Sequence, residues 1–244
     1  MFSITKPPDW CQLPLYKKVE IYSHKIGRTY APYVDKLMAK EIVKKLCADR
    51  IKVAPVVRIL TSCDDIKQQD INSRHLIKAA HGSGWYIDMA LIQDLVQIKK
   101  LLFGWNRVFS STENQYKFIK PRFFIEDKIV CKYKGKTGNA HDAKIHCFHG
   151  QPKIIFIRKD AVLRNYYDTL WNPLMPLEFE FDKPENLDEI LSLASILSAQ
   201  FEYVRVDFYM GVDGIYFSEF TFTPHGGKQK LSDEVEEVYG KLWV

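Results

Sequence analysis

Periodic patterns of apolar residues divide the chain into helices and strands. A repeat of about 3.6 residues predicts four helices. They cover residues 35–48, 88–103, about 186–200 and the segment from Ser232 onward. Asp35 has a side chain suited to capping the first helix, and Gly104 stands where the second would end. The first thirty residues show no such period, so they are predicted to be irregular.

Strict alternation of apolar and polar residues predicts strands in two groups. They cover residues 53–60, 75–80, 121–129, 142–148, 152–158, 203–210 and 215–222. The last four form two hairpins, turned at 149–151 and 211–214. The basic, glycine-containing segment 132–141 is predicted to be a flexible loop. Because no repeated βαβ alternation is present, the predicted class is α+β with mainly antiparallel sheets.

The last predicted hairpin gathers polar side chains on one face. Its members are Tyr203, Arg205, Asp207 and Tyr209 on the first strand, and Phe217, Glu219, Thr221 and Thr223 on the second. Mg²⁺ prefers one or two carboxylates together with substrate phosphates, and Asp207 and Glu219 supply such a pair. The alternative is an ordinary polar face with an ion pair between Arg205 and Asp207. These residues alone leave both interpretations open.

A second candidate site follows the predicted strand 75–80. Lys78 lies just before the glycine-containing turn 81–84, so its ammonium and the backbone N–H groups of the turn could contact phosphate oxygens. A plain turn is the alternative. Three nearby histidines, His141, His146 and His149, are interpreted as ordinary residues rather than a transition-metal site. Alternation sends His146 and His149 to opposite faces of their strand.

Composition narrows the classes of ligand. The chain has 244 residues and a formal net charge of +5, which favours anionic ligands without choosing among them. No motif of a nucleic-acid-binding module is present, so no nucleic-acid partner is expected. No apolar run is long enough for a spanning helix, which argues against membrane insertion. The five cysteines form no C-x-x-C pair, as is usual in a reducing compartment, and the chain is expected to be cytoplasmic.

Taken in order, these segments resemble the ATP-grasp superfamily, and specifically its TupA-like branch, named for teichuronopeptide biosynthesis. The resemblance covers about residues 30–230. It rests on a helix opened by Asp35-Lys36, then VAPVV, HLIKAAHGSG, FIKPRFFIEDKI, DAKIHCFHGQPK, RNYYD and VRVDFY…IYFSEFTFTPHGG. The resemblance implies an ATP-grasp fold, in which two α+β lobes grip ATP. It further implies an irregular segment over 1–34, an N-terminal part with the glycine-loop lobe over 35–128, and a C-terminal lobe with the metal site over 129–244.

The resemblance also implies roles for single residues. ATP would contact Lys36, Lys78, His81, Gly82, Ser83, Gly84, Lys144 and Tyr209, together with a hinge of Glu126, Asp127, Lys128 and Ile129. Mg²⁺ would be held by Asp207, Glu219 and Thr221. The catalytic residues would be Arg205 and Lys144, and the substrate would contact Arg164, Asn165, Tyr167 and Arg205. Many members of the superfamily have asparagine where Thr221 stands, and Trp85 stands where a further glycine is common.

The implied activity is an ATP- and Mg²⁺-dependent ligase that joins a carboxylate to an amine through an acyl phosphate. In the TupA-like branch the product would be an amino acid or peptide attached to a sugar or polysaccharide precursor. Two alternatives remain at this point. One is a kinase that phosphorylates a hydroxyl, and the other is a nucleotide-binding module of a glycan-assembly complex without turnover.

Overall fold

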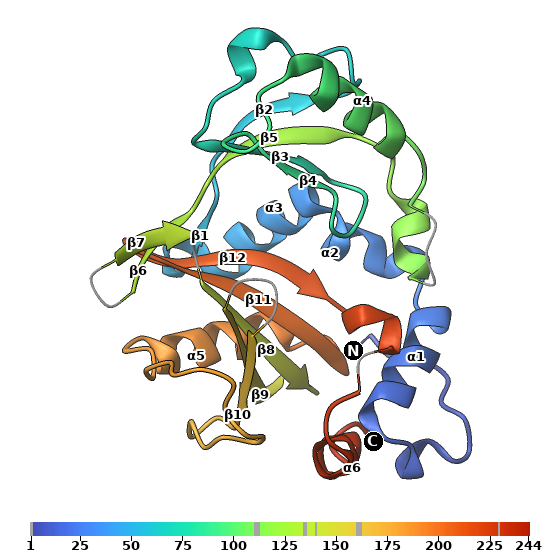
Figure 1. Cartoon of the computed structure of the whole chain (residues 1–244). Coiled ribbons are helices and arrows are strands. Elements are labelled where there is room, and N and C mark those ends of the chain that lie inside the picture. The colour runs from blue at the N-terminus through green and yellow to red at the C-terminus, as the bar shows by residue number, and fades with distance from the viewer. Residues whose placement is uncertain (1, 110–112, 134–135, 140, 160–162, 229) are drawn as a thin grey trace.

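The largest sheet of the computed structural model has six strands (Figure 1). The structure describes residues 2–109, 113–133, 136–139, 141–159, 163–228 and 230–244. The strand order is β1 (Lys52–Val53), β12 (Gly214–Thr221), β11 (Tyr203–Gly211), β8 (His141–Phe148), β9 (Gln151–Lys159) and β10 (Leu163–Tyr167). Only the edge pair β1–β12 is parallel, and the other pairs of this sheet are antiparallel.

A four-stranded antiparallel sheet lies apart from the large one (Figure 1, top). Its order is β2 (Val56–Leu60), β5 (Phe123–Asp127), β3 (His75–Ala79) and β4 (Tyr86–Asp88). It has its own apolar cluster, to which helix α4 (Leu95–Trp105) contributes Ile98 and Leu102. A short hairpin of β6 (Val130–Tyr133) and β7 (Lys136–Asn139) follows β5. The predicted α+β class with mainly antiparallel sheets is confirmed.

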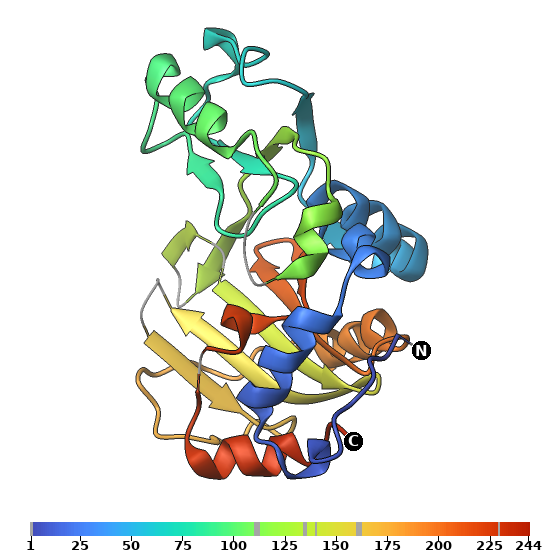
Figure 2. The ribbon, with the colours of Figure 1, turned by 90° about the vertical axis from the view of Figure 1, so that its right-hand side faces the viewer.

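The remaining helices pack on the large sheet or close to its ends (Figure 2). The α-helices are α1 (Leu15–Lys25), α2 (Ala31–Val34), α3 (Lys36–Cys47), α5 (Leu187–Ser198) and α6 (Asp233–Gly240). The 3-10 turns are η1 (Trp10–Gln12), η2 (Arg28–Tyr30), η3 (Ala48–Arg50), η4 (Gln68–Asp70), η5 (Asn114–Phe118) and η6 (Pro224–Gly227). Helix α5 contacts β8, β9 and β11, while α3 contacts α5 and β12.

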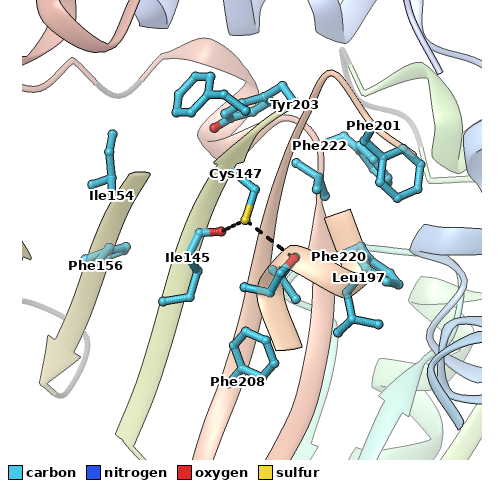
Figure 3. Packing of buried hydrophobic residues seen from close by; sticks show 14 of the residues in the cluster. Ile145, Cys147, Ile154, Phe156, Leu197, Phe201, Tyr203, Phe208, Phe220 and Phe222 are labelled. Atoms are coloured by element: carbon cyan, nitrogen blue, oxygen red, sulfur yellow. Dashed lines mark hydrogen bonds between the residues drawn. The ribbon is translucent and has the colours of Figure 1, made fainter. Parts of the chain in front are cut away.

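The side of the large sheet under α5 is apolar and forms part of the large core, which also includes Phe156 and Tyr203 from the other side of the sheet (Figure 3). Cys147 lies under α5 with Ile145 and Phe208, and its thiol contacts the backbone carbonyls of Ile145 and Ala194 at 3.6 and 3.9 Å. Burial raises the pKa of Cys147 to about 12. Because side chains alternate along each strand, packing this face leaves the opposite face to the polar residues of β8, β11 and β12.

The N-terminal segment 1–34 was predicted to be irregular, but it contains helices. Leu15, Val19 and Tyr22 lie on one face of α1 and enter the large core. Pro14 occupies the N-cap of α1, so the proline that suggested irregular chain instead precedes a helix. Helix α3, assigned to the N-terminal lobe, also packs in the large core through Ala39 and its neighbours.

Three other local predictions need correction. The helix predicted over 88–103 begins only after Asp94, whose side chain accepts the N–H groups of Val96 and Gln97, and it continues past Gly104. The strand predicted over 53–60 is split between two sheets, because Pro55 cannot donate to a ladder. The segment 132–141 is largely hairpin rather than loop, and 134, 135 and 140 lie outside the described residues.

Candidate active site on the polar face of the large sheet

Asp207 is the centre of the polar face. It is fully buried, and β11 places it directly opposite Glu219 on β12 and Lys144 on β8. Arg205 donates through Nε to Oδ1 and through Nη2 to Oδ2, both at 2.7 Å, and Lys144 Nζ contacts Oδ2 at 2.5 Å. Burial alone would raise the pKa of Asp207, but the two cations outweigh it and hold the pKa below its usual value.

The Arg205–Asp207 ion pair therefore exists, but it is buried rather than solvated as the alternative interpretation supposed. Arg205 also donates to Thr221 Oγ1 at 3.2 Å. Lys144 reaches a second carboxylate, Asp142, at 3.3 Å. Burial lowers the pKa of Lys144, and Asp207 and Asp142 more than reverse this, so the ammonium stays charged.

Glu219 is the more accessible of the two carboxylates, with 31% of its side chain exposed. Thr221 Oγ1 donates to Oε1 at 3.3 Å, and Lys36 Nζ lies 3.6 Å from Oε2. Burial would raise its pKa, but Lys36 helps to lower it, while Asp207 opposes this. Directly opposed residues of an antiparallel pair have Cβ atoms about 4.5–5.5 Å apart, so both carboxylates can reach one cation.

Phe217 was predicted to share the face of Glu219, and it does not. The pairing of β11 with β12 shifts between Asp207 and Phe208, so that Phe208 lies opposite Phe217. The β-bulge at Ser218 turns Phe217 into the core, where it is 2% exposed. A strict alternation rule cannot detect one inserted residue.

Lys36 links the two sheets. It is the first residue of α3, where Asp35 caps the helix by accepting the N–H groups of Leu37 and Met38. Lys36 Nζ donates to Gly82 O at 2.7 Å, and its backbone N–H donates to Ala80 O. One ammonium thus touches the glycine loop of the small sheet and faces Glu219 on the large sheet.

Lys78 belongs to a buried charge triad. Its Nζ lies 2.5 Å from Glu126 Oε1, while Lys40 Nζ lies 2.6 Å from Glu126 Oε2. Burial raises the pKa of Glu126, and the two lysines reverse this and lower it. Both oxygens of Glu126, a residue of the predicted hinge, thus face ammonium groups in this arrangement. Lys78 Nζ also lies 5.7 Å from the ring of Tyr209.

The residues of the predicted glycine loop, 81–84, differ in how exposed they are. Ser83 and Gly84 are exposed at the tip. His81 is buried, and its Nδ1 and Nε2 lie 3.1 and 2.8 Å from the carbonyls of Arg122 and Trp105, so its ring fixes the loop. A Cβ on Gly82 would come within 3.0 Å of the rings of Trp85 and Phe109. The loop is therefore packed against aromatic side chains at its base.

The predicted hinge is partly engaged in the small sheet. Lys128 Nζ pairs with Asp88 at 2.6 Å, and Asp127 pairs with His75 at 3.2 Å. These side chains thus join strands β3, β4 and β5 to each other. Ile129, the last residue of the predicted hinge, is half-buried between β5 and β6.

Of the three predicted substrate residues on 164–167, only Arg164 lies on the polar face. The segment is strand β10 rather than a loop. Asn165 is 1% exposed and donates to Phe179 O and Tyr167 Oη. Tyr167 is 2% exposed and stacks on Trp171 with ring centroids 4.0 Å apart. Asn165 and Tyr167 are thus buried on the α5 side of the sheet, away from the face that carries Lys144, so the structure does not bring them together with the other predicted site residues.

A cavity lies beside Arg205, between α1, η6 and the large sheet. Its walls are mainly apolar and aromatic, and Arg205, His146 and Glu236 are the charged or titratable members beside the tyrosines. The lining residues are Leu15, Tyr16, Val19, His146, Phe156, Tyr166, Tyr203, Arg205, Pro224, Gly227, Leu231 and Glu236. His146 Nδ1 lies 2.9 Å from Tyr203 Oη. Burial and the charges of Arg205 and Lys144 lower the pKa of His146, so its ring is neutral.

The donor set suits a hard cation better than a transition metal. Within the described ranges, no group of three or more His, Cys, Asp or Glu could hold a metal ion, and this covers His141, His146 and His149. Asp207, Glu219 and Thr221 offer oxygen only, as Mg²⁺ requires, and the remaining ligands would be phosphate oxygens and water. The residues present fit such an ion, with Glu219 the exposed ligand and Asp207 the shielded one.

A model of the TupA-like ATP-grasp family matches residues 17–244. The chain belongs to this family. The match includes α1, so the N-terminal helix missed by the sequence pattern is part of the family's domain. A search of curated proteins found no match.

Solved structures show the same fold. D-alanine–D-alanine ligase from Bacillus anthracis, solved with ATP, superposes with a TM-score of 0.52 at 14% identity, over 86% of this chain and 62% of that one. Biotin carboxylase from Campylobacter jejuni gives 0.50 at 13% identity, over 86% and 44%. The chain thus spans between about two-fifths and three-fifths of the length of these proteins. In the part of the TupA-like chain that the structure describes, no helix is both long and apolar enough to cross a membrane.

Sequence reasoning missed three charged residues that complete the site. Lys40 shares Glu126 with Lys78, Asp142 shares Lys144 with Asp207, and Arg158 contacts Asp142 at 2.5 Å. The alternation of β8 and β9 could have revealed the last two, because Asp142 shares the face of Lys144 and lies opposite Arg158. No local pattern links Lys40 to Glu126, which is 86 residues away.

Proposed function

We propose that this TupA-like protein is an ATP- and magnesium-dependent ligase that joins a carboxylate to an amine. The observation that carries the proposal is the placement of Glu219. This partly exposed carboxylate lies opposite buried Asp207 and faces Lys36, which also contacts the glycine loop. Oxygen ligands for a cation and ammonium groups for phosphates thus meet between the two sheets.

The position of each polar residue in the site suggests which ligand it would hold. Glu219, Thr221 and Asp207 would hold Mg²⁺, which supplies charge neutralisation of the phosphate oxygens when bound. Lys36 and Lys78 would hold phosphates, while the exposed backbone at Ser83 and Gly84 closes over them. Glu126 and Lys40 fix the position of Lys78. Lys144, placed beside Asp207, would face the transferred phosphoryl group.

The adenine would lie against the backbone of the 126–129 hinge, with Tyr209 packing near it. Arg205 remains the residue proposed to stabilise the activated carboxylate. It lines both the metal face and the cavity beside α1. The amine-bearing substrate would approach Arg205 from the side of this cavity.

The proposed chemistry has two steps. A carboxylate oxygen attacks the γ-phosphorus and the bond to ADP breaks, which gives an acyl phosphate. The amine nitrogen then attacks the acyl carbon, the C–O bond to phosphate breaks, and the nitrogen loses a proton. Positioning and charge neutralisation suffice, and no protein nucleophile is needed. The TupA-like branch suggests a sugar or polysaccharide precursor as one partner and an amino acid or peptide as the other.

The direct test is ADP release with pairs of carboxylates and amines drawn from amino acids, short peptides and uronic acids. Turnover that requires both partners supports the ligase. A phosphorylated alcohol formed without an amine would replace it with a kinase. Nucleotide binding without turnover by any pair would reduce the protein to a binding module. Lys78→Ala serves as the site variant, and Lys44→Ala, on the exposed side of α3, serves as the matched control.

A further inference from the structure

Two arginines face each other on the polar side of the large sheet. Arg164 on β10 is the direct cross-strand partner of Arg158 on β9, which in turn lies opposite Asp142 on β8. Alternation puts all three on the side of the sheet that carries Lys144. Like charges placed directly opposite one another in a sheet are destabilising, so this pair costs folding free energy.

Protein carboxylates compensate only part of that charge. Arg158 pairs with Asp142 at 2.5 Å, and Asp142 is already shared with Lys144. The guanidinium of Arg164 has no ion-pair partner among the described residues. The nearby carboxylate of Glu178 instead accepts the backbone N–H of Arg164 at 2.8 Å. Among the residues that the structure describes, no carboxylate therefore pairs with the guanidinium of Arg164.

A loop from the other end of the site faces the same charges. His225 belongs to η6, which follows β12, and it is exposed. Although the residue as a whole is exposed, partial burial of its imidazole lowers the pKa, and the charges of Arg205, Arg164, Lys144 and Arg158 lower it further. An uncharged imidazole beside these cations can donate a hydrogen bond to an anion without adding to their repulsion.

We propose that Arg158 and Arg164 bind an anionic group, a carboxylate or a phosphate, which the substrate carries in addition to the carboxylate that is activated. This rests on the proposed ligase function and names its substrate class. Strands are about 4.8 Å apart, so Arg158 lies about 10 Å across the sheet from Asp207. The bound group therefore belongs to another part of the substrate molecule. Two guanidinium forks suit such an oxyanion, because each can bind it bidentately.

The test measures anion binding by calorimetry in protein saturated with Mg²⁺ and a non-hydrolysable ATP analogue, which occupies the phosphate site of Lys36 and Lys78. The probes are inorganic phosphate, glutarate and acetate. Phosphate or glutarate should bind more tightly than acetate, and which of the two is preferred identifies the group. Arg164→Ala and Arg158→Ala should each weaken this binding about tenfold or more. Arg50→Ala, which removes an exposed arginine paired with Glu189, should leave it unchanged.

Two results would overturn the subsite. One is that both arginine variants bind phosphate and glutarate as tightly as the wild type does. The other is a loss of affinity for the ATP analogue in Arg164→Ala as large as the loss for the anions, which would assign the arginines to the nucleotide. Failure of the ligase proposal looks different. In that case ADP release needs no amine or does not occur with any pair of substrates, while the anions still bind and still depend on Arg158 and Arg164.

Discussion

Asp207 and Glu219 look equivalent in the sequence, since each lies on the same face of one hairpin. Their surroundings differ in the folded chain. Asp207 has no exposed surface and accepts from both Arg205 and Lys144, whereas Glu219 keeps 31% of its side chain exposed and faces Lys36 at 3.6 Å. The first carboxylate is shielded between two cations, and the second is the more accessible of the two.

Asp207→Asn should therefore destabilise the protein. It leaves two buried cations, Arg205 and Lys144, without their shared counter-charge, and breaking a buried pair costs about 3–5 kcal/mol. The free energy of unfolding from urea titration measures this directly. Glu41→Gln, on the exposed side of α3, is the control and should change it by less than about 1 kcal/mol. An Asp207→Asn protein as stable as the wild type would contradict the description of the buried pair.

Glu126 gives a pH dependence with a defined sign. Two lysines hold its pKa below the usual value, although burial opposes them. A carboxylate with a lowered pKa adds stability above its unfolded pKa of about 4.3, and that stability is lost as the pH falls further. Urea titrations between about pH 6 and 3 should show stability falling on acidification, and less steeply in Glu126→Gln.

Glu126→Gln leaves Lys40 and Lys78 without a counter-charge, so a second variant keeps the pH test usable. Glu126→Gln combined with Lys40→Met removes one of the two buried cations and should show the same shallower slope. Identical slopes in the wild type and both variants would show that the Glu126 carboxylate does not carry this pH dependence.

At the level of the elements, α1 and η6 pack against each other beside the cavity next to Arg205. Gly227 has a φ of +76°, and a Cβ there would lie 2.5 Å from the backbone nitrogen of Glu20 on α1. The close approach lets η6 lie against α1 and beside the cavity next to Arg205. The sequence does not predict that η6 lies against α1 or beside the cavity, because the glycine pair 226–227 indicates only a turn.

Gly227→Ala should destabilise the protein by about 2 kcal/mol or more, because it adds both a clash and an unfavourable φ. Gly104→Ala is the matched control. Gly104 lies inside α4, and a Cβ there meets nothing within 4 Å. That change should stabilise by about 0.5–1 kcal/mol. Thermal unfolding of both variants measures the difference, and equal effects would contradict the tight contact between η6 and α1.

Element boundaries were predictable where a local signal sets them. Asp35 caps α3 as its sequence position indicates, and the hairpin of β8 and β9 turns at His149 and Gly150, both with positive φ. The predictions failed where a partner distant in sequence decides the outcome. Helix α1 packs against η6 and α6, the end of α4 is fixed by Trp105 stacking on Trp85, and the bulge at Ser218 follows from pairing with β11.

At the scale of the whole molecule, the site depends on bringing two sheets together. Lys36 and Lys78 come from the first third of the chain, and Asp207 and Glu219 come from its last fifth. Alternation alone put the two carboxylates on one face, the turn after Lys78 pointed to that lysine, and the family resemblance added Lys36. The triad of Lys40, Glu126 and Lys78 and the structural role of Asn165 depend on tertiary packing, which no local pattern encodes.

The most direct test of the central claim is the thermal stabilisation of wild type and Glu219→Gln by ATP and Mg²⁺. At about 100 times the dissociation constant, ligand binding adds about 2.7 kcal/mol, or roughly 5–10 °C in Tm for a domain of this size. The wild type should show this shift only with both ligands present. Glu219→Gln should melt like the wild type without ligand, because Glu219 is partly exposed, and should lose most of the shift. A full shift in Glu219→Gln, or none in the wild type, would contradict a magnesium–nucleotide site between the two sheets.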